Sequence, residues 1–556
     1  MVPNGETTAQ LTREAETMGS TDADVKSTSK PKPPNVKAVR LATLVGSGLG
    51  VVAVALTGSL IGTLMPTLVN EFEQMRQAAW YGSAYLLVMG ATQPAFGKLT
   101  ALLASKLVFH ISVVFFAAGS VICALAKDSP MFIGGRAVSG LGGGGIVSGA
   151  LELTTLVDPQ NRALSCRILL VLESFGAMVG PAIGGAITSN IGWRWCFWTN
   201  LPIAVIVLGL TLFPLRLPRQ TSTRRKDKSR VLTLRDKFYQ CDVFGGALLA
   251  GSLACLLLAL EWGGDRFKWD DIRTIILLVA FGISFIFFVI HQACKVEAAV
   301  LPIRLCKAPH FSANLFMGFC LGGAQYAALY YNQLPTWFQT VKALSPADSG
   351  IRMLAMTAAA TLASLLAVGG LKTFRYYLLP LAITAIALAS VGAGVLYALG
   401  FGMSDSRWIG YLVMYGLGSG MGVQLAILGA QAAVGPSDFS HAISSILSFS
   451  AIAGSIFVFS GQQLFINQLL RFSEEPVELK RKTLKISFAA ILEKASAEVN
   501  VLVANTINDG VRQMFLVGLI LCSITIFALP FMPWKPLKPK PQKNQGIGKE
   551  ATAVTV

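Results

Sequence analysis

The side chains of this sequence that could do chemistry are a few charged residues inside long apolar runs. Glu173 lies about ten residues into the run 164–191, so it has little chance of reaching water unless a cavity comes to it. Because a charge at this depth costs several kcal/mol unless it faces a cavity or a partner, Glu173 is the leading candidate for a proton carrier. The alternative is a protonated structural glutamic acid that is hydrogen-bonded to a neighbouring helix.

Two more charges lie in the preceding apolar run, 133–156. Arg136 is near its start, and Glu152 follows sixteen residues later, which is about 24 Å along a helix. The two side chains are therefore too far apart to pair. Glu152 is a further candidate for proton coupling, and its alternative role is a carboxylate that reaches the cytoplasmic interface.

The residue patterns of other catalytic chemistry are missing from this sequence. Its nine cysteines are scattered without C-x-x-C pairs or zinc spacing, and its four histidines share no local pattern. It contains no G-x-x-x-x-G-K-[ST] phosphate loop of the kind that an ATP-driven pump needs. We therefore expect no enzyme activity, no metal site and no cofactor, and any transport work would draw on a gradient.

Uncharged polar and aromatic residues also recur at membrane depth. Most of them are expected to form hydrogen bonds between helices, while a minority would line an apolar, aromatic pocket with few polar anchors. Such a pocket suits a lipophilic small molecule better than a sugar or an ion. The candidates for this pocket are Gln93, Gln325, Tyr326, Tyr330, Asn332, Gln424 and Gln431.

Membrane spans are the elements that must position these residues. The chain has 556 residues, 53% of them hydrophobic and only 13% charged, whereas soluble proteins carry about 25% charged residues. Apolar runs long enough for a bilayer of about 30 Å recur fourteen times. The runs are 44–68, 79–99, 107–126, 133–156, 164–191, 201–215, 243–262, 272–291, 311–334, 349–370, 377–399, 409–428, 443–465 and 514–532.

The charge pattern predicts how the spans are oriented. The net charge of +17 comes largely from short connectors between apolar runs, not from one aromatic-interleaved patch, so nucleic-acid binding is not expected. Basic connectors belong on the cytoplasmic side, which places both termini there. We expect a multi-pass protein, monomeric, in the plasma membrane or alternatively the vacuolar membrane. The predicted divisions are a disordered tail 1–43, a six-helix bundle 44–215, a basic connector 216–242, two linker helices 243–291, a second six-helix bundle 292–533 with an outer loop 467–512, and a tail 534–556.

Glycines mark where helices can approach closely. In the run 164–191, Gly176, Gly180 and Gly184 are four residues apart on one helix face, with Pro181 and Gly185 beside them. The segment predicts a kinkable, closely packed helix. A formal G-x-G-x-x-G match lies in the run 133–156, but it sits inside an apolar helix and not after a strand, which argues against a dinucleotide site.

These motifs together resemble the major facilitator superfamily, specifically its fourteen-span drug:proton antiporter group, which includes fungal toxin and secondary-metabolite efflux pumps. The resemblance covers 45–535 and rests above all on GPAIGG followed by GWRWCFWTNLP, together with GGRAVSGLGGGG, WYGSAYLL and the closing PWK. It implies an all-α polytopic membrane protein with the major facilitator fold, in which two six-helix bundles are joined by two additional helices. It also implies that Arg136 takes part in proton transfer.

The sequence departs from the pattern of that family in two places. The family's first span usually carries an acid in a pattern like L-D-x-T, whereas here Leu56 is followed by Thr57 and no carboxylate. The gating loop between the second and third spans, with Gly97, Lys98 and Lys106 as its candidate residues, is eroded to GKLTALLASK: Gly97, Leu99 and Lys106 of the family pattern remain, but the aspartate is missing. Either Glu173 and Glu152 have taken over these charges, or coupling is weak.

The sequence thus predicts a proton-coupled efflux transporter that opens alternately to each side and exports a lipophilic metabolite, toxin or drug. Its partners would be that substrate, protons and the lipid bilayer. Two alternatives remain at this point. One is a gradient-driven uptake carrier for a siderophore-like or basic solute, and the other is a transporter-shaped receptor.

Overall fold

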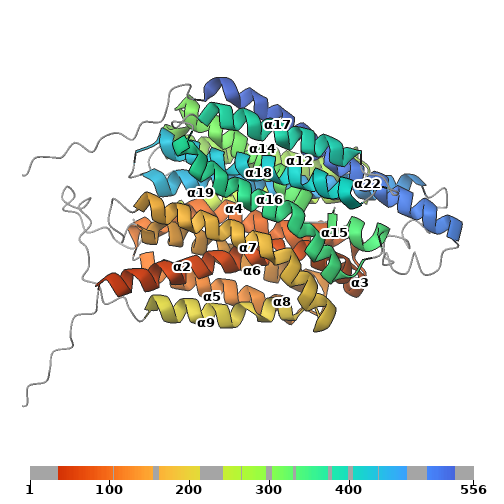
Figure 1. Cartoon of the computed structure of the whole chain (residues 1–556), viewed down its shortest axis with the longest axis horizontal. Coiled ribbons are helices and arrows are strands. Elements are labelled where there is room, and N and C mark those ends of the chain that lie inside the picture. Colours follow the sequence, from red (N-terminus) through yellow and green to blue (C-terminus); the bar gives the residue numbers. More distant parts are fainter. Residues whose placement is uncertain are drawn as a thin grey trace, which may run out of the picture.

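The computed structural model describes residues 36–103, 105–154, 162–212, 242–263, 266–295, 303–329, 334–342, 344–373, 378–398, 403, 405–435, 438–472 and 497–532. These residues are almost entirely helical. Figure 1 shows the long helices running roughly parallel, with the earlier helices of the chain gathered on one side and the later ones on the other. The predicted all-α membrane fold is confirmed.

The first group of helices covers the six spans expected within 44–215. It consists of α2 (Val36–Ser59), α3 (Ile61–Phe72), α4 (Ala78–Leu102), α5 (Ser105–Ala124), α6 (Ser129–Leu153), α7 (Arg162–Asn190), α8 (Trp195–Trp198) and α9 (Asn200–Leu212). We call this group the first half. We call the end of the bundle where α2 begins the inner end, and the end where α3 stops the outer end, following the orientation that the charge pattern predicts.

The remaining helices form a linker pair and a second half. The linker pair is α11 (Val243–Trp262) and α12 (Ile272–Cys294). The second half contains α13 (Ile303–Cys306), α14 (Pro309–Leu329), α15 (Leu334–Thr336), α16 (Pro346–Thr373), α17 (Leu378–Tyr397), α18 (Asp405–Ala433), α19 (Phe439–Phe472) and α22 (Ala497–Ile524).

Each of the fourteen expected spans is helical, the first of them as two helices, α2 and α3. Within the described residues, eleven helices are long and apolar enough to cross a membrane by composition alone. The spans in α4, α6 and α14 are less apolar because glycine, serine and glutamine interrupt them. Small and polar residues of this kind let membrane helices pack closely and bond to each other.

The structure corrects the expected boundaries at both ends of the bundle. The first span is broken at Leu60, whose carbonyl accepts a hydrogen bond from the backbone of Thr63 at 3.2 Å and from its hydroxyl at 2.9 Å. The last span begins at Ala497, earlier than the expected residue 514, and α19 continues to Phe472. The outer loop is therefore shorter than the predicted 467–512, and the rest of it, residues 473–496, lies outside the described residues.

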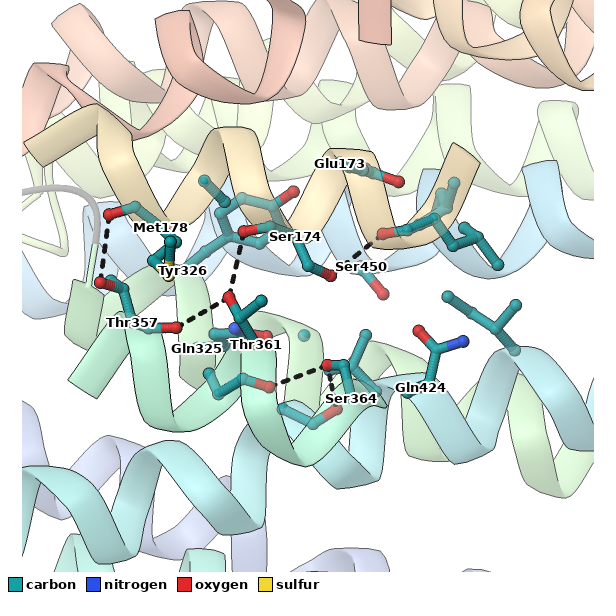
Figure 2. Close-up of a pocket in the computed structure, with 18 residues that line it drawn as sticks. Glu173, Ser174, Met178, Gln325, Tyr326, Thr357, Thr361, Ser364, Gln424 and Ser450 are labelled. Atoms are coloured by element: carbon teal, nitrogen blue, oxygen red, sulfur yellow. Dashed lines mark hydrogen bonds between the residues drawn. The ribbon is translucent and has the colours of Figure 1, made fainter. Parts of the chain in front are cut away.

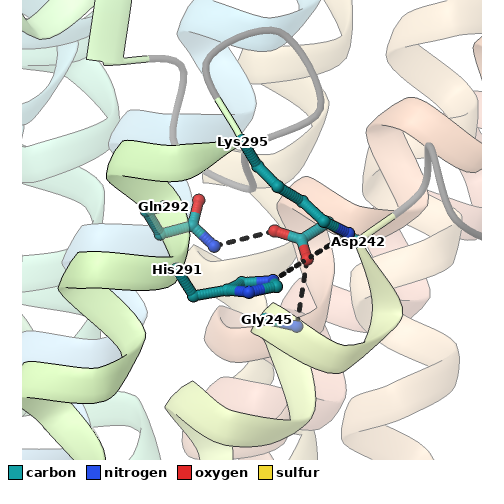
Figure 3. A network of polar contacts seen from close by, with 5 residues as sticks. All are labelled: Asp242, Gly245, His291, Gln292 and Lys295. Carbon is teal, nitrogen blue, oxygen red and sulfur yellow. Dashed lines mark hydrogen bonds and ion pairs between the residues drawn. The ribbon is translucent and has the colours of Figure 1, made fainter.

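At its inner end, the linker pair is tied together by one buried carboxylate (Figure 3). Asp242 caps α11 through a 3.2 Å bond from the Gly245 amide, and its oxygens lie 2.7 Å from both His291 Nε2 and Gln292 Nε2. Lys295 Nζ is 3.6 Å away. Burial raises the pKa of the Asp242 carboxyl, but the bonds from His291 and Gln292 and the nearby positive charges outweigh burial and hold this pKa below its ordinary value. Asp242 is therefore both the N-cap of α11 and its tie to α12.

We expect Asp242→Asn to destabilise the protein by roughly 3 kcal/mol, because it leaves the Lys295 ammonium and the His291 ring facing an amide in a buried site. A carboxyl whose folded pKa is depressed stabilises the fold above its unfolded pKa and loses that contribution as the pH falls through the folded value. The melting temperature of the purified protein should therefore drop in the variant at pH 7. Asp270→Asn, at an exposed position of the same linker, is the control, and equal melting temperatures for the two variants would contradict the prediction.

Candidate functional site

A cavity of about 100 Å³ lies between the two halves (Figure 2). The first half contributes only α7 to its described lining, whereas the second half contributes α14, α16, α18 and α19. Nine of its eighteen lining residues carry hydroxyl, amide or carboxyl groups. They are Glu173, Ser174, Gln325, Tyr326, Thr357, Thr361, Ser364, Gln424 and Ser450.

Glu173 is the single charged side chain among the described lining residues. It projects from the middle of α7 and is half-buried. Figure 2 shows it on the wall formed by α7, with the hydroxyls of α16 and the amide of Gln424 on the facing walls. A carboxyl group in this position can bind or release a proton next to anything that occupies the cavity.

The α7/α16 seam closes the cavity toward the outer end. Here α7 and α16 run antiparallel, and α16 of the second half donates three hydrogen bonds to α7 of the first, the first two about one turn apart and the third about three turns further toward the outer end. The bonds run from Thr361 Oγ1 to the Ser174 carbonyl at 3.2 Å, from Thr357 Oγ1 to the Met178 carbonyl at 3.2 Å, and from the Ala347 amide to Ser189 Oγ at 3.1 Å. The first of these bonds is made to the residue next to Glu173.

Two glycines allow this seam to close. A Cβ atom at Gly185 of α7 would overlap the carbonyl oxygen of Pro346, and one at Gly350 of α16 would overlap the carbonyl oxygen of Pro181. Both of these oxygens are backbone atoms of the opposite half, and they cannot move aside as the end of a flexible side chain could. The closed outer end therefore requires glycine at both positions.

The other glycines of the GPAIGG helix pack inside the first half. A Cβ at Gly176 would lie 2.6 Å from the Val52 carbonyl oxygen. Gly180 and Gly184 approach the same strip of chain, where the nearest atoms belong to Ser59 and Leu60. The expected common face of Gly176, Gly180 and Gly184 thus packs against α2 and α3, while Gly185 alone turns to the second half.

The α4/α19 seam, on a different pair of helices, is also closed. Ser83 Oγ donates to the Ser455 carbonyl at 3.3 Å, and Ser448 Oγ donates to the Gly90 carbonyl at 2.6 Å. Nearer the inner end, a Cβ at Gly97 would lie 3.8 Å from a ring nitrogen of His441. This seam is therefore in contact along most of its length.

Outer-end contacts between the halves complete the closure. Gln339 Nε2 donates to the Thr63 carbonyl of α3 at 3.1 Å, and Gln462 Nε2 donates to the Met75 carbonyl at 3.5 Å. Together with the two seams, these bonds place the halves against each other on the outer side of the cavity.

Arg136 is fully buried but does not line the cavity. Its Nε donates to the Tyr81 carbonyl at 2.8 Å and its Nη1 to the Thr57 carbonyl at 3.3 Å, while the guanidinium lies 4.3 Å from the centre of the Tyr85 ring. Arg136 therefore ties α6 to α4 and α2 within the first half. Thr57, which stands where an acid was expected, offers it a carbonyl and not a carboxylate.

The other candidates are distributed between the cavity and its surroundings. Gln325, Tyr326 and Gln424 line the cavity, whereas Gln93 and Gln431 are buried outside its described lining. Glu152 is half-buried near the inner end of α6. Gly97, Lys98 and Lys106 lie near the inner ends of α4 and α5, and the predicted sites Tyr330 and Asn332 lie outside the described residues.

Residues 48–458 match the family model described as Major Facilitator Superfamily. The chain belongs to this superfamily. It is 45% identical over 518 residues to "Efflux pump apf11" of Gibberella fujikuroi, a match that covers 93% of this chain and 91% of the relative. It is 40% identical over 524 residues to "MFS-type transporter TOXA" of Cochliobolus carbonum, covering 93% and 94% of the two chains.

Solved structures agree with this assignment at the level of the fold. A bacterial homolog of the human lysosomal transporter Spinster, in an inward-facing and unoccupied conformation, has a TM-score of 0.61 at 13% identity and covers 90% of this chain and 99% of its own. A D-xylose-proton symporter has a TM-score of 0.54 at 13% identity, with coverage of 90% and 99%. As a member of the Major Facilitator Superfamily, the chain is a multi-pass membrane transporter.

Sequence reasoning missed most of the polar lining of this transporter's cavity. The cavity has more polar anchors than expected, because nine of its eighteen lining residues carry hydroxyl, amide or carboxyl groups, and Tyr326 is the single aromatic residue among those described. Thr357, Thr361 and Ser364 follow each other at intervals of four and three residues, which places them on one helix face. This spacing was the feature of the sequence from which the polar wall of the cavity could have been predicted.

Proposed function

We propose that this transporter exports lipophilic small molecules in exchange for protons, by alternating access between its two halves, 44–215 and 292–533. The observation that carries the proposal is a single carboxyl group, Glu173, in a cavity between those halves. The names of the two fungal relatives, an efflux pump and a major-facilitator-type transporter, support export of small molecules. The charge pattern supports cytoplasmic termini, and we place the protein in the plasma membrane as a monomer.

The polar lining adjusts the substrate class. A molecule that partitions into a bilayer but carries several hydrogen-bonding groups can satisfy the hydroxyl and amide groups of the cavity, which would otherwise lose their hydration without compensation. With Glu173 ionised, the cavity carries a negative charge and favours neutral or cationic substrates over anions. Protonation removes that charge, so proton and substrate bind in alternation.

The proton cycle needs one titratable group that is exposed alternately to the two sides of the membrane. In the cycle we propose, Glu173 loses its proton toward the inner end, the cavity takes up substrate, and the outer end then opens. A proton from outside replaces the substrate and the halves return. When the substrate is neutral, each entering proton moves one charge, and the electrical gradient supplies about 2.3 kcal/mol per 100 mV. When the substrate is a monovalent cation, the exchange moves no net charge and the pH gradient drives it.

Arg136 and Glu152 have supporting places in this scheme. Arg136 is held by backbone carbonyls and an aromatic ring. Its effect on coupling would therefore be indirect, because it fixes the position of α2. Glu152 lies toward the inner end, where we assign it to the exit path of the proton. Neither side chain belongs to the described lining of the cavity.

Proteoliposomes with an imposed pH gradient test the proposed function. We expect a fluorescent lipophilic dye to accumulate on the acidic side of the membrane and the accumulation to collapse when a protonophore is added. Accumulation on the alkaline side would instead favour an uptake carrier that moves with protons. Saturable dye binding without any gradient-dependent movement would contradict transport and favour a receptor.

A further inference from the structure

The linker pair covers the α4/α19 seam. Leu249, Leu253 and Leu257 of α11 lie at intervals of four residues, which places them on one helix face. They are buried in an apolar cluster that also contains Leu87 of α4 and Ile452 of α19. Since α4 belongs to the first half and α19 to the second, α11 packs against both halves at once.

Polar contacts fasten the outer end of α11 to each half separately. Trp80 of α4 donates its indole N–H to Glu261 Oε2 at 2.8 Å. Gln463 of α19 donates its amide to the Gly263 carbonyl at 3.2 Å. Because Glu261 and Gly263 are only two residues apart, α4 and α19 are anchored to nearly the same point of the linker.

A direct ring contact lies at the same level. The Trp80 ring meets the Phe459 ring edge-on, with their centroids 4.8 Å apart. Trp80 therefore touches the second half through its ring and the linker through its N–H. If α4 and α19 moved apart at this level, the ring contact and at least one of the two linker hydrogen bonds would have to break.

The linker can resist such a movement because its two helices are joined. At the inner end the Asp242 network, described above, binds the start of α11 to the end of α12 (Figure 3). A single helix could follow one half and release the other without much loss. A helix that packs on both halves and is joined to a second helix is harder to displace.

We propose that the linker pair is a clasp that holds α4 against α19 near the outer end and so favours the state in which the outer end is closed. The inference rests on the alternating access of the proposed function, but it concerns the balance between two conformations and neither the substrate nor the proton. Its prediction is that weakening either anchor shifts the transporter toward the outward-open state.

A cysteine at Val69 can report that shift. Val69 is 3% exposed and lines a small pocket at the outer end together with Phe465 of α19, so it becomes reachable when the halves part there. Val69→Cys is labelled with a water-soluble maleimide on purified protein in detergent, where the orientation in a membrane does not matter. Labelling of the parent chain without Val69→Cys gives the background from native cysteines.

The anchor variants should label faster than the Val69→Cys parent. Trp80→Phe, Glu261→Gln and Gln463→Met each remove or weaken one anchor, and we expect rates about tenfold higher for the first two, since each affects a hydrogen bond to a charged group. If Trp80→Phe fails to fold, the other two variants carry the test. Trp262→Phe is the matched control, because that indole packs near Phe267 of the linker itself.

Parent-like labelling in all anchor variants would overturn the clasp, and so would an equal increase in the Trp262→Phe control. The measurement needs no substrate and no pH gradient. A failure of the clasp therefore leaves proton-coupled export standing, and a failure of export in vesicles leaves the labelling result unaffected.

Discussion

Glu173→Gln should abolish uphill transport while leaving downhill exchange of substrate intact. Glutamine keeps the size and hydrogen-bonding capacity of the side chain but cannot ionise. The described cavity lining then has no group that binds and releases a proton, so the pH gradient can no longer drive transport. We expect gradient-driven accumulation to fall by at least roughly tenfold. Exchange of labelled for unlabelled substrate across vesicles without a gradient should persist, because it needs only the opening and closing of the halves.

The split between the two assays separates a proton carrier from a structural glutamic acid. A residue that merely holds α7 in place would affect exchange and accumulation together when it is replaced. Glu152→Gln is the comparison variant, because it removes an acid of the same half that we place on the exit path of the proton and outside the described cavity lining; it should slow accumulation without abolishing it. Accumulation that survives in Glu173→Gln but fails in Glu152→Gln would transfer the role to Glu152.

Gly185→Ala and Gly350→Ala should each prevent the outer end from closing. The added methyl group would overlap a backbone carbonyl oxygen of the opposite half, and closely packed backbones cannot absorb such an overlap without moving apart. We expect the transport rate to fall by roughly tenfold or more, as for an overpacking cost of about 1–3 kcal/mol applied to one state of the cycle. Reactivity of a cysteine at Val69 should rise at the same time.

Gly134→Ala and Gly209→Ala are the controls for this pair, since a Cβ at either position meets no atom within 4 Å. Both should transport at the parent rate. If Gly185→Ala and Gly350→Ala transported as well as these controls, the closed outer end would not be an obligatory step. If they lost transport without any gain in Val69 reactivity, the substitutions would have damaged the fold and not the gate.

The fourteen spans could be predicted because the bilayer sets a length and a composition that show directly in the sequence. The capping role of Asp242 was predictable for a similar reason, since a cap is decided by neighbours along the chain. The break at Leu60 was not predictable, because it depends on how the hydroxyl and amide of Thr63 share one carbonyl. An apolar run reveals its length but not a local change of hydrogen bonding within it.

The candidate site was predictable only in its charged member. A carboxyl group deep in an apolar run is rare enough to single out Glu173, whereas Thr361 and Ser364 resemble the many hydroxyls that bond within their own membrane helices. The hydrogen-bond partners of Arg136 could not be predicted either, because they are backbone carbonyls, which every residue has and which no residue pattern indicates. Likewise, the pairing of Trp80 with Glu261 joins residues far apart in the sequence.

Proton exchange through Glu173 predicts that a substrate gradient alone moves protons across the membrane. Vesicles loaded with a pH-sensitive dye, without an imposed pH gradient, are given substrate on one side, and the internal pH is followed with time. We expect the substrate gradient to drive protons in the opposite direction through the parent protein, and Glu173→Gln to move substrate without this proton flux. Equal proton flux in both proteins, or substrate movement through the parent without any proton flux, would contradict proton exchange at Glu173.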